Sequence, residues 1–305
     1  MFAGAALLLL LFFLVPVVVV ALVVGTVLVI SSRPDASLSS EVAGARRHAV
    51  TTGALSTLVA VATPFFVLAA FGASYALRLS FGLPFRPVAC APLAGAFVGL
   101  VVLLVGELTW PRPTGASRTA LLQDRSMRTL LDSGWVRLTV VAVAVATVAL
   151  VIGGLVGDGQ SITHVRPGGA TSAGPFPGWG FAAPQLVMLA LCLGLAVACV
   201  GATSRRSAVV RADAETDDLL RRASVARVGR LVLASALVTL GADLFFGGLA
   251  AQSAYPEGGW HTVAASVTLA GPLLLLLGLV ALALPAPRLP AVHLTPTSTA
   301  SSMPA

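Results

Sequence analysis

The stretch LVLASALVTLGADLFFGGLAA, residues 231–251, shows what kind of protein this chain is. It is long enough to cross a bilayer, which requires about 20 predominantly apolar residues. Its one ionisable residue is Asp243. A carboxylate at the centre of such a helix costs about 2.5–3.5 kcal/mol, which the surrounding Leu, Val and Phe residues offset. The stretch therefore predicts a transmembrane helix that carries an acidic side chain.

Comparable apolar stretches recur along the whole chain. We expect an all-α fold, a polytopic bundle of about seven transmembrane helices within residues 1–284. The tail, residues 285–305, is rich in Pro, Ser and Thr, and we expect it to be disordered. The predicted helices lie near 2–30, 50–77, 88–108, 136–156, 184–202, 231–251 and 262–284.

Composition excludes an ordinary soluble protein. Of the 305 residues, 57% are hydrophobic and 10% are charged, whereas soluble domains average about 25% charged residues. The first apolar stretch is much longer than the core of a signal peptide, and no basic residue precedes Arg33. We therefore expect it to remain as a helix.

The arginines predict the orientation in the membrane. All basic residues are arginine, and of these 19 all but Arg78, Arg86 and Arg166 fall in the linkers after the first, third and fifth predicted helices or in the C-terminal tail. The positive-inside rule places those linkers in the cytoplasm. The N-terminus is then outside and the C-terminus inside, in a multi-pass protein of the plasma or inner membrane.

The positive charge indicates a lipid partner. Because the arginines lie in short linkers between apolar segments, we expect them to contact anionic headgroups at the cytoplasmic face and not nucleic acid. The sequence identifies no protein partner.

The loops differ in character. Outer loop 157–183 is rich in Gly and Pro, which argues against a folded domain there. In the last inner linker, acidic residues precede basic ones, and Asp217–Arg221 and Asp218–Arg222 have favourable i,i+4 spacing. We expect 213–230 to form a solvated helix that continues into the sixth transmembrane helix.

The main candidate site is an intramembrane polar stripe. Ser235, Thr239 and Asp243 are spaced so that they share one helix face, which we expect to turn toward the bundle. The stripe either binds an ion, a proton or a polar substrate, or it forms an interhelical hydrogen-bond clasp, with Gln185, Ser266 or Thr268 as candidate partners.

A second candidate lies at the membrane interface. Glu107 ends the third predicted helix beside Trp110 and Arg112. An interfacial carboxylate paired with an arginine needs no function, so we interpret Glu107 and Arg112 as structural. Gly95-x-x-x-Gly99 and Gly153-x-x-x-Gly157 are interpreted as positions of close packing within the bundle.

The usual catalytic motifs are missing. The sequence has no Gly-x-Ser-x-Gly, no His-Glu-x-x-His and no Walker A lysine. Cys90, Cys192 and Cys199 lie in apolar segments and are interpreted as small buried hydrophobes. The histidines are scattered, so a metal site would require His164 and His261 to meet outside the membrane. We predict no catalytic residues, metal or cofactor.

Two segments resemble known sequences. Residues 106–120, GELTWPRPTGASRTA, and residues 213–222, DAETDDLLRR, resemble phrases of uncharacterised polytopic membrane proteins of high-GC bacteria. The resemblance implies an integral membrane protein and brings no activity or catalytic residue with it.

Three functions compete. The first is a transporter-like or channel-like protein for a small ion or solute, based on Asp243 and on prolines in three predicted helices, Pro16, Pro64 and Pro272. The second is a non-catalytic membrane subunit, anchor or assembly factor that acts through its basic inner linkers. The third, an intramembrane enzyme, lacks a nucleophile–base pair.

Overall fold

The computed structural model describes residues 25, 40–76, 86–110, 130–167, 169–209 and 214–284. Their helices are α2 (Ser40–Ala76), α3 (Arg86–Ala89), α4 (Ala91–Leu108), α6 (Gly134–Val156), α7 (Trp179–Arg205), α8 (Ala214–Ala254) and α9 (Gly259–Ala283). Two short strands, β1 (Ile162–Arg166) and β2 (Gly169–Ala173), lie between α6 and α7.

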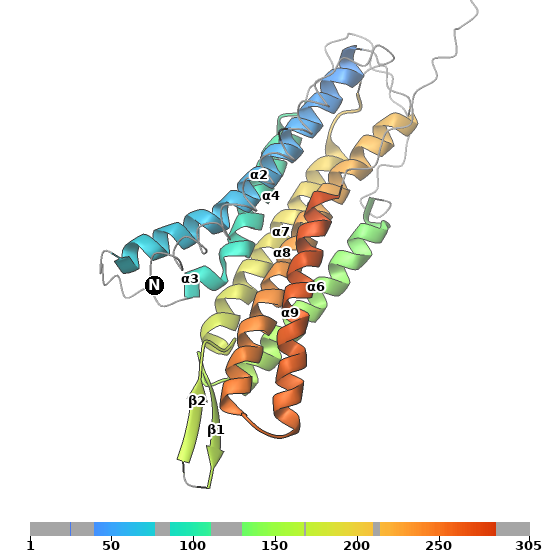
Figure 1. The fold of residues 1–305 in the computed structure, drawn as a ribbon. Coiled ribbons are helices and arrows are strands. Elements are labelled where there is room, and N and C mark those ends of the chain that lie inside the picture. Colours follow the sequence, from blue (N-terminus) through green and yellow to red (C-terminus); the bar gives the residue numbers. More distant parts are fainter. Residues whose placement is uncertain are drawn as a thin grey trace, which may run out of the picture.

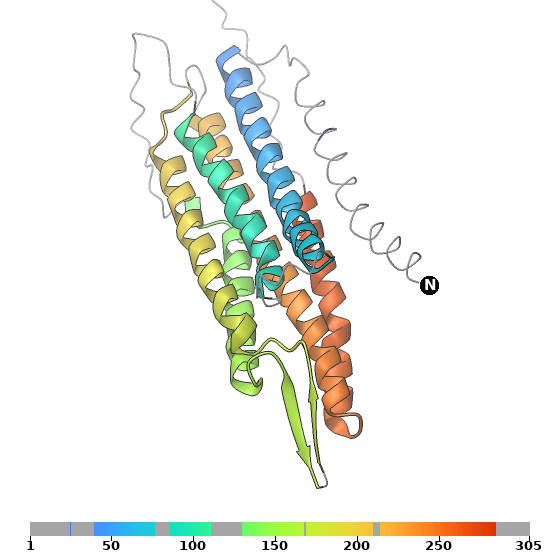
Figure 2. The same cartoon turned by 90° about the vertical axis from the view of Figure 1, so that its left-hand side faces the viewer.

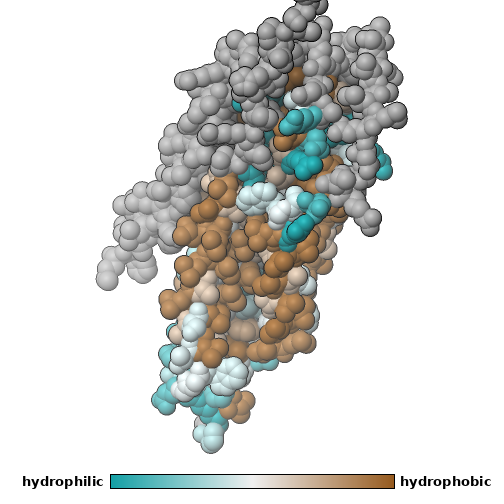
Figure 3. Space-filling view, turned by 90° about the vertical axis from the view of Figure 1, so that its right-hand side faces the viewer, coloured by the Kyte–Doolittle hydropathy of each residue, from teal (hydrophilic) through white to brown (hydrophobic). Residues whose placement is uncertain are grey.

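Six of these helices are long and apolar enough to cross a membrane, namely α2, α4, α6, α7, α8 and α9. They indicate a multi-pass membrane protein, in agreement with the predicted helical membrane bundle. Figure 3 shows a broad apolar belt on one face of the molecule, with hydrophilic residues toward both ends. The predicted helix 2–30, apart from Gly25, and the predicted tail 285–305 lie outside the described residues, so the count of seven stays a prediction.

The long helices run side by side, and the C-terminal part of α2 bends away from the others (Figures 1 and 2). α8 lies at the centre: 61% of its most apolar window is buried, against 44% or less in the other five spanning helices. The fully buried side chains of the core include Leu93, Leu100, Val232, Cys192 and Cys199, which come from α4, α7 and α8. Both α7 cysteines donate to α4 carbonyls, which fits their interpretation as buried packing residues.

Glycines allow several helices to approach closely. A Cβ at Gly99 of α4 would lie 3.0 Å from the Ala60 side chain of α2, and one at Gly95 would collide with the Ala60 carbonyl. This confirms Gly95-x-x-x-Gly99 as a packing position. In α8 and α9, a Cβ at Gly241 or Gly271 would lie 2.7 Å from the other residue's carbonyl oxygen.

α8 begins well before its membrane-spanning part. It is continuous from Ala214 through the arginine-rich segment to Ala254, which confirms the predicted helical linker over the described residues. The expected solvation of this segment is wrong in part, because Asp217 and Arg221 are 5% exposed. The end of α7 packs against this turn, and the spacing of charges along one helix cannot reveal such a neighbour.

The loop 157–183 contains an element that its composition did not predict. β1 and β2 form an antiparallel hairpin in which Ile162 faces Ala173 and Arg166 faces Gly169. Ile162 is buried against Ala250 and Ala254 at the end of α8. The hairpin lies at the opposite end of the bundle from the start of α8 (Figure 1).

Candidate functional site

Asp243 contacts a polar residue of a neighbouring helix in the middle of the bundle. Gln185 Nε2 donates to Asp243 Oδ1 at 3.1 Å and to the Ala89 carbonyl at 3.2 Å. One amide therefore joins α8, α7 and the turn between α3 and α4. The prediction that Asp243 faces the bundle is confirmed, and its partner is Gln185. Ser266 and Thr268 instead donate to carbonyls of their own helix.

Three buried oxygens at this level have no hydrogen-bond partner among the described residues. They are Asp243 Oδ2, Gln185 Oε1 and Thr239 Oγ1. Thr239 lies one helical turn before Asp243, on the same face. Ser235, the third residue of the predicted stripe, donates to the carbonyl of Val232 in its own helix. Buried polar groups are normally paired, so these three unpartnered oxygens require an explanation.

The backbone around this site is irregular. Cys90 forms a turn that separates α3 from α4 and lies beside Ala89, which accepts from Gln185. Pro184 lies within α7 directly before Gln185, and Pro272 lies within α9 directly after Gly271, which packs on α8. In transporters, interrupted helices line substrate and ion sites near the middle of the membrane.

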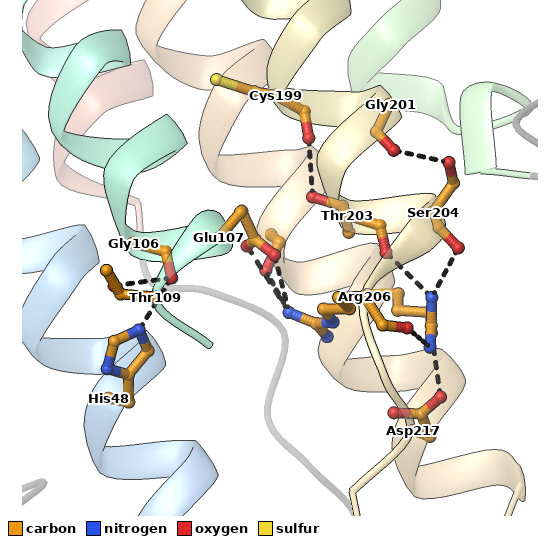
Figure 4. Close-up of polar contacts among 12 residues, drawn as sticks. His48, Gly106, Glu107, Thr109, Cys199, Gly201, Thr203, Ser204, Arg206 and Asp217 are labelled. Carbon is orange, nitrogen blue, oxygen red and sulfur yellow. Dashed lines mark hydrogen bonds and ion pairs between the residues drawn. The ribbon is translucent and has the colours of Figure 1, made fainter. Parts of the chain in front are cut away.

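A second polar site lies at the end of the bundle where α8 begins (Figure 4). Glu107, at the end of α4, accepts from Arg206, which follows α7, at 3.1 Å. The two side chains are 10% and 1% exposed. The predicted pairing of Glu107 with an arginine is found with Arg206; Arg112 lies outside the described residues.

Arg206 makes two further contacts. Its Nη1 donates to Ser224 Oγ of α8 at 3.3 Å, and its guanidinium lies 3.8 Å from the centroid of the Trp110 ring. A guanidinium over the face of an indole is stabilised by a cation–π interaction. The Nε and Nη2 atoms of Arg206, and Nε1 of Trp110, are buried and have no acceptor among the described residues.

Arg221 joins the end of α7 to α8. It pairs with Asp217 at 2.8 Å, and it donates to the carbonyls of Thr203, Ser204 and Arg206 at 2.8–3.0 Å. The last carbonyls of a helix lack partners within the helix, and a basic side chain there satisfies them. By contrast, Asp218 and Arg222 form the exposed pair that their spacing predicts.

A small cavity of about 10 Å³ lies beside this site. Its polar lining consists mainly of His48, Thr52, Glu107, Trp110, Ser224 and Arg227. His48 and Gly106 O are 2.8 Å apart, which ties the start of α2 to α4. Arg227 packs its side chain against α2, where a Cβ on Gly53 would lie 3.0 Å from Arg227 Cδ.

Among the described residues that form this site, guanidiniums outnumber carboxylates. Three guanidiniums, those of Arg206, Arg221 and Arg227, accompany the carboxylates of Glu107 and Asp217. Burial lowers the pKa of Arg206, and the nearby Glu107 carboxylate acts in the opposite direction. Arginine remains protonated in proteins even so, which leaves a buried cation with unused donors.

Two of the histidines, His164 and His261, lie beside Tyr255. His164 stacks on the Tyr255 ring at 4.3 Å, and His261 Nδ1 lies 3.2 Å from the Tyr255 carbonyl oxygen. Both therefore contact one residue outside the apolar belt. Within the described residues, no group of three or more His, Cys, Asp or Glu side chains is placed to hold a metal ion.

The sequence identified Asp243, Gln185 and Glu107 but missed Arg206, Ser224 and the cavity. Arg206 follows the end of one apolar helix, and Glu107 lies at the end of another. These positions are the signal in the sequence that could have predicted their pairing. Comparison with protein-family models, curated proteins and solved structures gave no match, so the function has to be inferred from these two sites.

Proposed function

We propose that this membrane protein is a transporter-like or channel-like protein for a small cation or a proton, with Asp243 as the central binding residue. The observation that carries the proposal is the set of unpartnered oxygens on Asp243, Gln185 and Thr239. A carboxylate and an amide oxygen accept hydrogen bonds or coordinate cations, so their free lone pairs call for a positively charged occupant.

A purely structural clasp explains these atoms less well. A clasp would be favoured if Gln185 satisfied both oxygens of the Asp243 carboxylate. Gln185 Nε2 donates only to Oδ1. An ionised carboxylate in a low-dielectric environment is costly unless it is paired and hydrogen-bonded. A proton on Asp243, or a cation between Asp243 and Gln185, would remove that cost, and either can be exchanged across a membrane.

Two helix prolines and one break between helices support movement at the same level. Pro184, Pro272 and the turn at Cys90 lie in three elements around the site. Such positions can absorb changes in helix direction, which alternating access of a central site requires. We further propose that the end with Arg206 and Arg221 faces the cytoplasm, because the arginine-rich linkers lie there.

The alternative, a non-catalytic subunit or anchor, is favoured by a different observation. Arg47, Arg205 and Arg222 are exposed at the end of the bundle where α8 begins, and they offer basic side chains to a partner. Against it, Arg206, Arg221 and Arg230 are buried, with their guanidiniums directed at groups within the bundle. They are therefore not free to form a docking surface.

Ion flux into proteoliposomes tests the proposal. Purified wild-type protein should conduct or exchange H⁺, Na⁺ or K⁺, followed with a pH-sensitive or ion-sensitive dye. Asp243→Asn keeps the size and much of the hydrogen bonding, so it should fold and lose the flux. Asp218→Asn removes a carboxylate from the exposed part of the same helix and should behave like wild type.

Two outcomes would contradict the proposal. One is a folded wild-type protein that moves none of the three ions, which would favour the subunit hypothesis. The other is an Asp243→Asn variant with undiminished flux, which would reduce Asp243 to a clasp. The melting temperature of each variant in detergent shows whether a lost flux reflects loss of folding.

A further inference from the structure

We propose that the cavity beside Arg206 binds an oxyanion of the phosphate type, with Trp110, Arg227 and Ser224 as its contacts. The cavity lies at the end of the bundle, away from Asp243, and the proposal does not depend on the transport function.

The unsatisfied atoms around the cavity are mainly nitrogen donors. Trp110 is 6% exposed, lines the cavity, and has no acceptor for its Nε1–H among the described residues. Arg206, which stacks on Trp110, has unused donors at Nε and Nη2. One acceptor, Asp217 Oδ1, is also unpartnered, but its other oxygen pairs with Arg221, and Asp217 does not line the cavity.

The other cavity residues add donors. The Arg227 guanidinium has five N–H groups, and the described residues provide no hydrogen bond or ion pair to it. Ser224 Oγ accepts from Arg206, which leaves its own proton free to donate. Two acceptors of the lining are already engaged: Glu107 by Arg206, and Gly106 O by His48. The lining therefore complements a group made of acceptor oxygens.

Charge and size favour one oxygen of a phosphate. Among the described residues around the cavity, Glu107 and Asp217 balance two of the three guanidiniums of Arg206, Arg221 and Arg227, so an anion would complete this local balance. The volume of about 10 Å³ is close to the room that one water-sized atom needs. A phosphate oxygen could enter the cavity while the rest of the group remains at its mouth. Arg and Trp N–H groups are strong donors to such an oxygen.

The phosphate can come from an anionic lipid headgroup or from solution. Equilibrium dialysis of the full-length protein in detergent distinguishes the two sources. The probes are inorganic phosphate and a soluble short-chain phosphatidic acid, each measured against chloride at equal ionic strength. Binding of both probes indicates that a free phosphate group suffices, and binding of phosphatidic acid alone indicates a lipid headgroup.

The variants test the cavity itself. Trp110→Phe removes the N–H and keeps a ring beneath Arg206, and Arg227→Gln removes one guanidinium. Each should weaken binding roughly tenfold, which is the effect of losing one hydrogen bond to a charged group. Arg222→Gln removes the same charge from an exposed position of α8 and should bind like wild type.

The proposal is wrong if neither probe binds better than chloride, in which case the cavity holds only water. It is also wrong if Trp110→Phe and Arg227→Gln bind as tightly as wild type while their melting temperatures show that they are folded. If Arg222→Gln weakened binding as much as Arg227→Gln does, general surface charge would attract the anion. This result would also contradict a specific site at the cavity.

Discussion

The middle of the bundle and the end with Arg206 leave opposite kinds of atoms without partners. Around Asp243 these atoms are all oxygens, on Asp243, Gln185 and Thr239. Around Arg206 they are mainly N–H groups, on Arg206 and Trp110. Unsatisfied acceptors call for a cation or a proton, whereas unsatisfied donors call for an anion. The two proposed sites therefore have opposite charge preferences within one chain.

The two regions also differ in how firmly they are built. At the end with Arg206, side chains bridge α4, α8 and the end of α7 through ion pairs and carbonyl contacts. In the middle, a single amide bridges three elements, and two of the surrounding helices, α7 and α9, contain a proline. We infer that the Arg206 region holds the helices together, while the Asp243 region is the part free to rearrange.

The largest expected effect concerns which side of the membrane each region faces. A cysteine at position 215, before the Arg206 site, should resist an impermeant thiol reagent in intact cells. A cysteine at position 170 in the exposed hairpin should react. The native Cys90 is only partly buried and is replaced by serine in both variants, whereas Cys192 and Cys199 are fully buried and give a low background. Labelling of position 215 from outside would reverse the orientation of both sites.

The next effect concerns the stability of the Arg206 region. Arg206→Met leaves the buried Glu107 carboxylate without its partner and should lower the free energy of unfolding by about 3–5 kcal/mol. The double variant Glu107→Gln/Arg206→Met should recover a large part of this loss. The measurement is unfolding in detergent, analysed as a double-mutant cycle.

Arg137→Met is the matched control for that cycle. Its pair with Asp132 has side chains 73% and 70% exposed, so the free energy of unfolding should fall much less than in Arg206→Met. Similar losses for Arg206→Met and Arg137→Met would show that the Arg206 region is not the rigid part of the molecule.

The smallest effect separates two hydroxyls of the intramembrane stripe. Ser235→Ala removes a hydrogen bond to Val232 and should lower the free energy of unfolding by about 0.5–1.5 kcal/mol. Thr239→Val removes a buried hydroxyl that has no partner among the described residues, so stability should be unchanged or slightly higher. Thr239→Val should nevertheless reduce ion flux if this hydroxyl belongs to the site. If Thr239→Val lowered the free energy of unfolding as much as Ser235→Ala does, the Thr239 hydroxyl would have to be paired.

Much of the bundle follows from apolar length alone. Helices near 88–108 and 136–156 were expected and lie at Ala91–Leu108 and Gly134–Val156, because a membrane span must satisfy its backbone as one continuous helix. The contact between Asp243 and Gln185 was also predictable, since few polar groups in the apolar segments can reach an intramembrane carboxylate.

Other features depend on contacts that a single sequence does not reveal. Arg221 has the spacing of an exposed i,i+4 pair, yet it is buried because the last carbonyls of α7 lie against it. The hairpin at Ile162–Ala173 is hidden in a Gly-rich and Pro-rich loop, and it is anchored by burial of Ile162 on α8. In both cases a neighbouring segment, and not the local pattern, determines the result.

The opposite preferences of the two sites can be measured in one set of melting curves. The Tm of wild type, Asp243→Asn and Trp110→Phe is measured in detergent, with N-methylglucamine chloride at pH 8 as the reference condition. In separate samples, one change is made to this condition: Na⁺, K⁺, pH 6 or phosphate. A ligand at about 100 times its Kd stabilises the folded state by about 2.7 kcal/mol, which is visible as a shift in Tm. We predict that Na⁺, K⁺ or acidification raises the Tm of wild type and of Trp110→Phe but leaves the Tm of Asp243→Asn unchanged. Phosphate should raise the Tm of wild type and of Asp243→Asn but leave the Tm of Trp110→Phe unchanged. Loss of both responses in the same variant, or a cation response that persists in Asp243→Asn, would contradict the existence of two separate sites with opposite charge preference.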